Sequence, residues 1–387
     1  MKGFFEFLER AFRKALVYPF FRIVLHNRVL DSPIDLSKVQ KLLILRHDRI
    51  GDMIITTPIF RNLKRLRPDL HLGILASRSN VELVKNNPFV DSVYVLGPSL
   101  VQLLREAQRI RRKHYEVVLS FVFNRTTSVA LLARLLAPAA LKIGHADEEY
   151  QFYFNRLVKL PRFSVHMVES LAAYIKEAFG IELQPEDLRF EIFVDELSKK
   201  GVDEFLVRNR LKRRMSSERE PLPYVLLNLS AKDADRRISV SQAKALALHL
   251  GERKDFRTLL LVAPDDHEMG AAVRTSQEFR KCLVYPERGR ATLLQLASLV
   301  EGAVCVFTPD TSIVHFASAS GTPVLGFFTM VQGMQEWLPY RVKYDLVVAP
   351  AGQPTSSIPL AEMMRGIDAF LNVTLPKSSL LVSSASA

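Results

Sequence analysis

The stretch AVCVFTPDTSIVHFASASGTPVLGFFT, residues 303–329, decides the fold class. Its first six residues, AVCVFT, form an apolar run typical of a buried strand, and Pro309, Asp310 and Thr311 supply the turn and N-cap chemistry that opens a helix. Gly321 ends that helix, and residues 324–328 form a second apolar strand. The order strand, helix, strand predicts a βαβ crossover of a parallel sheet.

The start of this predicted helix is the first candidate site. Its unpaired backbone N–H groups make a positive pole, and Thr311 and His315, which are four residues apart, fall on one face of the first turns. We therefore expect an anionic ligand at this end of the helix.

A second informative stretch is RHDRIGDMIITTP, residues 46–58. It follows the predicted strand KLLILR, and we expect Gly51 and Asp52 to form the turn before a helix that begins near Met53. This places the Asp52 carboxylate at the carboxyl edge of a parallel sheet, where open α/β sheets bind ligands. Asp52 is either a catalytic base or only the cap of the helix. Two sheets whose carboxyl edges face each other would form a cleft lined by both stretches.

A third candidate is NLSAKDADRR, residues 228–237, where a strand end is followed by small polar and then basic residues. Ser230 and the nearby backbone could contact a phosphate, and Arg236 or Arg237 could neutralise a diphosphate. The alternative is a solvated basic loop. Asp266, which follows another predicted strand, would contact a nucleoside or cap a helix.

Strands and helices alternate along both halves of the chain, which predicts two doubly wound α/β domains. The basic, proline-ended segment RNRLKRRMSSEREPLP is the predicted boundary between them. The predicted parts are an N-terminal basic helix with its linker, an acceptor domain, a nucleotide domain, a C-terminal helix and a disordered tail: residues 1–37, 38–215, 222–350, 358–373 and 375–387.

Composition narrows the classes of partner. The chain has 387 residues, a net charge of +12 and two cysteines, so we expect anionic substrates, no disulfide framework and a reduced, cytoplasmic compartment. Neither GxGxxG nor GxxxxGK[ST] occurs, and no spacing supports a metal site. The N-terminal amphipathic helix either packs on the first domain or lies on the inner face of the cytoplasmic membrane.

Together, RHDRIGDMIITTP, HMVESL at residues 166–171 and TPDTSIVHFASASGTPV resemble the bacterial lipopolysaccharide heptosyltransferase family, glycosyltransferase family nine. The resemblance extends in order and spacing over about residues 41–328. It implies a GT-B architecture of two facing Rossmann-like domains, with the acceptor on the first, the nucleotide sugar on the second and a C-terminal helix that crosses back.

The resemblance also assigns roles to residues. It implies that Asp52 is the general base, that Arg49, Gly51 and His166 contact the acceptor, and that a basic residue at Arg236 or Arg237 holds the diphosphate. The helix start binds the rest of the donor, through Asp310, Thr311, Ser312 and His315. Ser312 stands where the family usually has Gly, and Met330 stands where it has Pro, so this chain departs from the family around the donor pocket.

The function implied is an inverting, metal-independent transfer of heptose from ADP-heptose to an anionic, lipid-linked oligosaccharide of the lipopolysaccharide core. No cofactor is expected, because the nucleotide sugar is a substrate. The alternatives are another nucleotide sugar, a nucleotide-sugar-binding protein without turnover, and a nucleic-acid-binding protein suggested only by charge. The last lacks a helix-turn-helix, zinc-finger or RNP-like signature.

Overall fold

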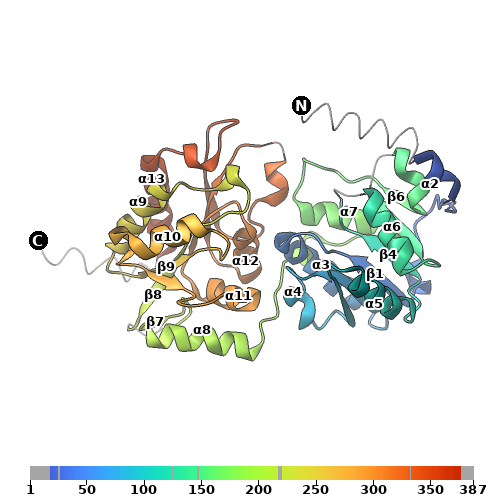
Figure 1. Ribbon diagram of the computed structural model, residues 1–387, viewed down its shortest axis with the longest axis horizontal. Helices are drawn as coiled ribbons and strands as arrows, with labels where there is room; N and C mark the ends of the chain where they lie inside the picture. Colours follow the sequence, from blue (N-terminus) through green and yellow to red (C-terminus); the bar gives the residue numbers. More distant parts are fainter. Residues whose placement is uncertain are drawn as a thin grey trace, which may run out of the picture. The chain divides into compact units, whose positions relative to one another are not determined.

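The computed structural model describes residues 18–24, 27–123, 126–145, 148–216, 220–331 and 333–375 (Figure 1). The chain divides into two compact units: unit 1 holds residues 1–81, 88–161 and 168–188, and unit 2 holds residues 82–87, 162–167 and 189–387. Within the described ranges, no helix has both the length and the apolar character that crossing a bilayer demands.

Unit 1 is a six-stranded parallel sheet in the order β3-β2-β1-β4-β5-β6. Its strands are β1 Lys41–Leu45, β2 His71–Ser77, β3 Ser92–Leu96, β4 Val117–Ser120, β5 Leu141–His145 and β6 Arg156–Val158. Its helices are α2 Tyr18–Val24, α3 Ile50–Leu66, α5 Leu100–Arg111, α6 Thr126–Leu136 and α7 Met167–Phe179, with the short η2 Leu36–Lys38, η3 Glu148–Tyr153 and η4 Pro185–Leu188.

The strands of unit 1 pair as their apolar runs predict, with Leu43 opposite Gly73 on one side and Val118 on the other. α5 and α6 cover one face of the sheet with buried residues that include Ala107 and Ala133. The sheet order reverses between β1 and β4, which makes the carboxyl ends of these two strands the switch point at which doubly wound sheets bind ligands.

Unit 2 repeats this topology with the strand order β10-β9-β8-β11-β12-β13, and β7 pairs with β8. Its strands are β7 Leu211–Lys212, β8 Leu222–Asn228, β9 Arg257–Leu261, β10 Leu283–Tyr285, β11 Val306–Pro309, β12 Val324–Phe328 and β13 Tyr344–Val348. Its helices are α4 Glu82–Lys85, α8 Glu196–Arg208, α9 Val240–Gly251, α10 His267–Thr275, α11 Leu293–Gly302, α12 Ser312–Ser320 and α13 Leu360–Thr374, with η5 Ala234–Arg236, η6 Gln277–Phe279, η7 Met334–Trp337 and η8 Thr355–Ser357.

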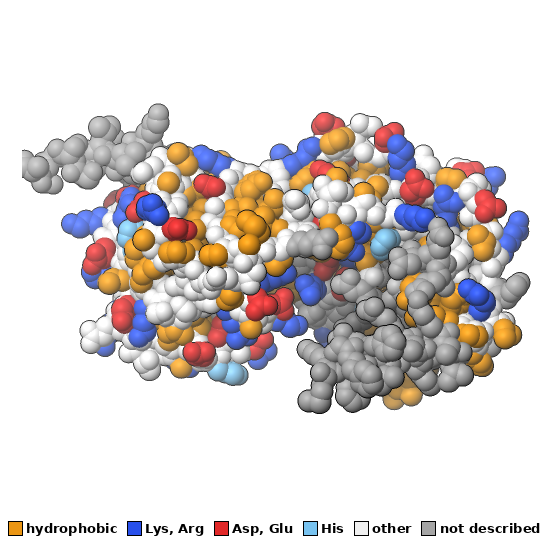
Figure 2. Space-filling model, turned by 90° about the horizontal axis from the view of Figure 1, so that it is seen from above, with side chains coloured by type: hydrophobic (Ala, Val, Ile, Leu, Met, Phe, Trp, Pro, Cys, Tyr) orange, Lys and Arg blue, Asp and Glu red, His pale blue; other side chains and the backbone are white. Residues whose placement is uncertain are grey.

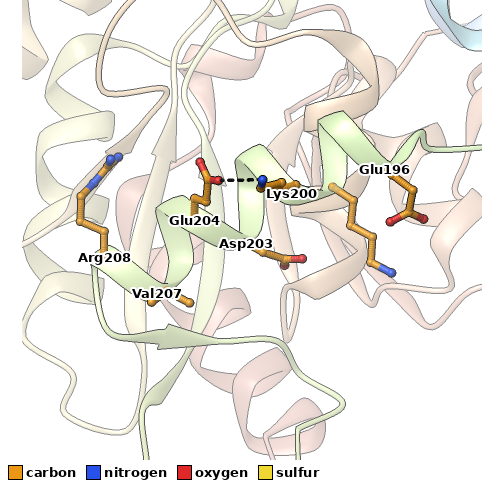
Figure 3. Close-up of a pocket in the computed structure, with 7 residues that line it drawn as sticks. Glu196, Lys200, Asp203, Glu204, Val207 and Arg208 are labelled. Carbon is orange, nitrogen blue, oxygen red and sulfur yellow. Dashed lines mark ion pairs between the residues drawn. The ribbon is translucent and has the colours of Figure 1, made fainter.

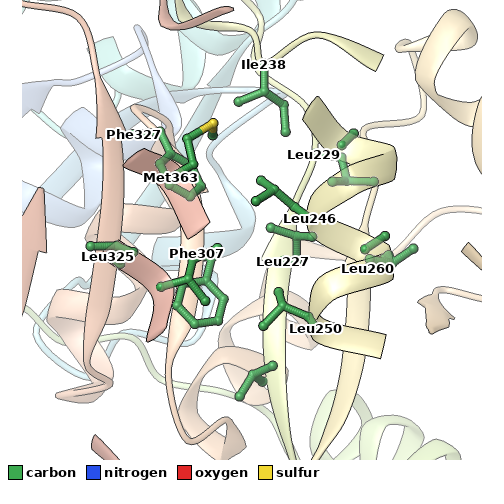
Figure 4. Close-up of a cluster of buried hydrophobic side chains, with 14 of the residues drawn as sticks. Leu227, Leu229, Ile238, Leu246, Leu250, Leu260, Phe307, Leu325, Phe327 and Met363 are labelled. Carbon is green, nitrogen blue, oxygen red and sulfur yellow. The ribbon is translucent and has the colours of Figure 1, made fainter. Parts of the chain in front are cut away.

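A core cluster of unit 2 fills the space between its sheet and the helices α9 and α13 (Figure 4). Leu246 and Leu250 of α9 and Met363 of α13 meet the strand residues Leu227 and Phe307 there. Both expected Rossmann-like domains are therefore present, and the βαβ unit predicted from residues 303–329 is β11, α12 and β12.

Two expectations about organisation are wrong, namely the position of the boundary between the units and the start of α3. The chain passes into unit 2 at residue 189, before the expected boundary, because α8 packs on α11 and β7 pairs with β8. α13 packs on β12, β13 and α9 of unit 2, and its expected crossing back to the first domain stays a prediction. α3 begins at Ile50, so Gly51 and Asp52 lie in its first turn and not in a turn before it.

Two predicted segments fall largely outside the described residues. Of the N-terminal part, residues 1–17 are not described, while α2 packs Phe21 near Tyr153 of unit 1. Of the predicted disordered tail, only Leu375, which follows α13, is described.

Candidate functional site

The carboxyl ends of β8 and β11 carry the polar centre of unit 2. At this switch point, the Asn228 side-chain amide donates hydrogen bonds to Thr308 Oγ1 at 2.9 Å and to Thr311 Oγ1 at 3.2 Å. Asn228 ends β8, so a side chain from one half of the sheet bridges to the other half. Asn228 opens the stretch NLSAKDADRR, but its role could not be predicted, because its partners lie about eighty residues away along the chain.

The N terminus of α12 follows directly. Thr311 is its N-cap, and Thr311 Oγ1 accepts a hydrogen bond from the Ile313 N–H at 3.3 Å. The neighbouring Asp310 is 8% exposed and pairs with Arg236, with Nη1 3.1 Å from Oδ2. Ser312 is the first helical residue and is half-buried. The structure thus brings together Asp310, Thr311, Ser312 and Arg236, as the sequence predicted.

Three other predicted donor residues have structural partners. Ser230 is buried, and its Oγ accepts a hydrogen bond from the Ala263 N–H at 3.0 Å. Asp266 is the N-cap of α10 and accepts a bond from the Met269 N–H at 3.3 Å, so the capping alternative is confirmed. Arg237 donates to the backbone oxygen of Ala231 at 2.8 Å and therefore braces its own loop. Of the two candidate arginines, only Arg236 is paired at the helix start.

His315 is buried and uncharged, so it does not offer a positive charge to a diphosphate. It lies in the second turn of α12, 4% exposed, with ring centroids 6.3 Å from those of both Phe190 and Trp337. Burial first, and then the charges of His166 and Arg236, lower the pKa of His315 to about 3. Its Nδ1 is buried and has no hydrogen-bond partner among the described residues. His315 is therefore neutral at ordinary pH.

His166 belongs to unit 2 and not to the acceptor unit in which we expected it. Its Nε2 lies 3.0 Å from the backbone oxygen of Leu338, and its ring lies near Tyr340 and Phe190. Burial lowers the pKa of His166 to about 4. The neighbouring Glu336 is 1% exposed and accepts hydrogen bonds from the Arg162 side chain and from the backbone N–H of Phe163. The segment that carries His166 therefore holds the loop that carries Trp337.

The polar centre of unit 1 is a buried ion pair at the β1–β4 switch point. Arg46 directly follows β1 and is fully buried, and its Nη2 lies 3.0 Å from Asp52 Oδ1. Arg46 also donates to the backbone oxygen of Phe121, after β4, and to Thr56 Oγ1 at 2.9 Å. It therefore ties both strands to the first turns of α3, and its sequence signal was only its position at the end of an apolar strand.

The other predicted residues of this region differ in accessibility. Asp52 is 7% exposed, Gly51 is buried beside it, and Arg49 is exposed at the N-cap of α3. Asp52 does not cap α3, because the N-cap residue is Arg49. The capping alternative for Asp52 is therefore wrong, and its partner is a buried guanidinium.

Possible metal ligands and a hollow along α8 are two further features of the described residues. Within the described ranges, no three His, Cys, Asp or Glu side chains are grouped so that they could hold a metal ion. A hollow of about 720 Å³ lies along α8 (Figure 3). It is lined by Glu196, Lys199, Lys200, Asp203, Glu204, Val207 and Arg208. One helix supplies this whole lining with charges of both signs, so no set of polar groups converges on a ligand there.

Comparison with known proteins decides the family. The model of glycosyltransferase family 9 (heptosyltransferase) matches residues 103–359, which is more than half of the chain. The chain belongs to glycosyltransferase family 9. This family 9 protein is 22% identical over 289 residues to the lipopolysaccharide heptosyltransferase 3 of Escherichia coli, covering 72% of this chain and 80% of the relative.

Solved structures agree on the fold of this family 9 protein. A family 9 glycosyl transferase from Veillonella parvula DSM 2008 superposes with a TM-score of 0.72 at 16% identity, over 89% of this chain and 100% of that one. The E. coli heptosyltransferase WaaC with ADP gives 0.62 at 18% identity, over 86% and 99%. The predicted family and the two-domain α/β fold are confirmed.

Proposed function

We propose that this chain transfers a heptose from ADP-heptose to the core of a lipopolysaccharide, with inversion at the anomeric carbon and without a metal ion. The observation that carries the proposal is the Arg236–Asp310 pair beside Thr311 at the N terminus of α12. The names of the relatives, and the ADP in the WaaC structure, support the sugar and the nucleotide.

The donor would bind at the carboxyl edge of the unit 2 sheet. A helix N terminus offers N–H groups and a positive dipole to a diphosphate, and a guanidinium offers a fork of N–H donors. Arg236 is about one-quarter exposed, with a side-chain accessibility of 28%, so it can reach a ligand while Asp310 holds it. These groups would stabilise the charge of the departing ADP without a divalent cation.

The acceptor would bind in unit 1, where Asp52 is the proposed base. Its carboxylate has one oxygen, Oδ1, bound by Arg46, which fixes the orientation of the group at the switch point. Arg49 is exposed one turn away and would contact an anionic group of the acceptor. His166 receives no acceptor role, since its ring nitrogen is engaged by Leu338 in unit 2.

The proposed reaction forms one bond, breaks one bond and transfers one proton. The acceptor hydroxyl oxygen attacks the anomeric carbon of heptose, its proton passes to Asp52, and the bond from that carbon to the diphosphate oxygen breaks. Attack opposite the leaving group inverts the anomeric configuration. ADP leaves as an anion held by Arg236 and the helix start.

The rival functions rest on fewer observations. A different nucleotide sugar, or binding without turnover, is suggested by Ser312, which occupies a position where the family usually has Gly. On the face drawn in Figure 2, Lys and Arg side chains are interspersed with Asp and Glu and form no continuous basic stripe. That face gives no support to a nucleic-acid partner.

Transfer assays with the Asp52→Asn variant test the proposal. We expect the unaltered chain to release ADP from ADP-heptose only when a lipopolysaccharide-core acceptor is present. We expect Asp52→Asn to lose about a thousandfold or more in kcat while its calorimetric affinity for ADP stays the same. Turnover that survives in the variant would refute Asp52 as the base. Binding of UDP or GDP sugars but not ADP sugars would refute the donor assignment.

A further inference from the structure

The first turns of α5 expose three large apolar side chains, which the other described elements leave open. Leu100 and Val101 are each 68% exposed, and Leu104 is 52% exposed. These positions lie on one side of a helix, so they form a single patch. Further along the same helix, Ala107 and Ile110 pack into the core. Leu100, Val101 and Leu104 are thus the part of this helix whose apolar side chains stay exposed.

Elsewhere among the described residues, large exposed apolar side chains occur singly or in pairs, such as Phe20 with Ile23 on α2 and Met330 with Val331. Leu197 and Val207 of α8 are 81% and 76% exposed, but they are ten residues apart and separated by charged side chains. Isolated apolar residues are normal on protein surfaces, whereas adjacent ones call for a partner.

The patch lies at the same edge of the unit 1 sheet as Asp52. α5 connects β3 to β4, so its first turn lies at the carboxyl edge of the unit 1 sheet, beside the edge strand β3. The first turn of α3, which carries Asp52, follows β1 at the same edge (Figure 1). The patch thus borders the edge at which unit 1 would receive its acceptor.

The charges around the patch are mainly positive. Arg78, from the loop after β2, donates to the Gln102 side-chain oxygen at 2.9 Å and so lies against the first turn of α5. Arg105, which directly follows Leu104, is exposed and has no ion pair within the described ranges. The acidic residue of α5, Glu106, is already paired with Arg109 at 2.8 Å. The uncompensated charges beside the patch are therefore cationic.

We propose that this face of α5 docks on an anionic lipid bilayer. Large apolar side chains next to arginines are the pattern of helices that lie in the interface of a membrane, where the apolar groups enter the acyl boundary and the cations meet phosphates. The use of this contact rests on the proposed function, because an acceptor anchored by acyl chains presents its sugars close to the bilayer. Docking through α5 holds the Asp52 edge of unit 1 at that surface.

Vesicle co-sedimentation tests the docking directly. The probes are vesicles of phosphatidylcholine with phosphatidylglycerol, and vesicles of phosphatidylcholine alone. We expect the full chain to prefer the anionic vesicles, and the L100S/V101S/L104S variant to bind them about tenfold or more weakly. The matched control, L197S/V207S on α8, should bind like the unaltered chain. Binding of the α5 variant within twofold of the unaltered chain would overturn the proposal.

A second pair of measurements separates this contact from folding and from the proposed function. Circular dichroism melting and ADP calorimetry should be unchanged in the α5 variant. The R78E/R105E variant leaves the apolar patch intact, and it should also lose vesicle binding and the salt dependence of that binding. Transfer to an acyl-free core oligosaccharide should persist in both variants. If no chain transfers sugar to any acceptor, the proposed function fails, while the vesicle result still decides the docking. A protein partner that binds through the patch while vesicle affinity stays unaltered would overturn it.

Discussion

Arg46→Met is the sharpest perturbation of the unit 1 centre. Methionine keeps an unbranched, apolar stem of similar length, so the change mainly removes the guanidinium. That guanidinium is fully buried and donates to Asp52 Oδ1 at 3.0 Å, to Thr56 Oγ1 at 2.9 Å and to the backbone oxygen of Phe121. The variant therefore loses the charge pair with Asp52 at the point where β1, β4 and α3 meet. It also loses the hydrogen bonds to Thr56, to Asp48 and to the backbone oxygens of Asp52 and Phe121.

The size of the effect follows from burial. The side chains of Arg46 and Asp52 are 0% and 9% exposed, and removing one partner of a buried ion pair costs about 3–5 kcal/mol, because the other charge stays in a poorly solvated site. The second carboxylate near Arg46, Asp48, is 23% exposed and adds less. We expect the free energy of unfolding of unit 1 to fall by about 3 kcal/mol.

A chain of two units need not unfold in one step, so the free energy of unfolding must be measured for unit 1 alone. Hydrogen exchange in urea, followed on peptides from β1 and α3, provides this measurement. The matched control is Arg65→Met on the same helix, whose pair with Asp187 is 59% and 41% exposed and should contribute less than about 1 kcal/mol. In the double variant with Asp52→Asn, the losses should not add. A loss for Arg46→Met no larger than that for Arg65→Met would refute the buried-pair reasoning.

Two further predictions concern unit 2. Burial lowers the pKa of His166 to about 4 and that of His315 to about 3, from 6.5. The unfolded chain therefore binds protons first as the pH falls, so stability should decline from pH 6.5 down to about 4, by about 2 kcal/mol per histidine at pH 5. Urea midpoints measured against pH should show a shallower decline in His166→Gln, and an unchanged slope would contradict this cause. Thr311→Ala should cost about 1 kcal/mol through the lost N-cap and also weaken ADP binding, whereas Thr292→Ala, which removes the cap of α11, should cost the same without changing ADP affinity in calorimetry. Equal ADP affinities would remove Thr311 from the donor site.

Local chemistry made the elements readable from the sequence. The apolar run before Pro309, the cap chemistry of Thr311 and the helix-ending Gly321, whose φ is 66°, predict β11 and α12 without any distant contact. Parallel βαβ topology follows from the alternation itself, because such crossovers place successive carboxyl ends on one edge. Asp52, Asp310 and Thr311 were therefore found at their sheet edges from sequence position alone.

What the sequence could not decide was which side chains meet across the sheet order. Asn228 reaches Thr308 and Arg46 reaches Phe121 only because the strand order reverses between β8 and β11 and between β1 and β4. The unit boundary was misplaced for the same reason, since nothing local in α8 says that its partner is α11, about a hundred residues later. Hydrogen-bonding propensity and hydrophobic periodicity are properties of neighbours along the chain, whereas the burial that neutralises His315 and encloses Arg46 is created only when distant segments close around them.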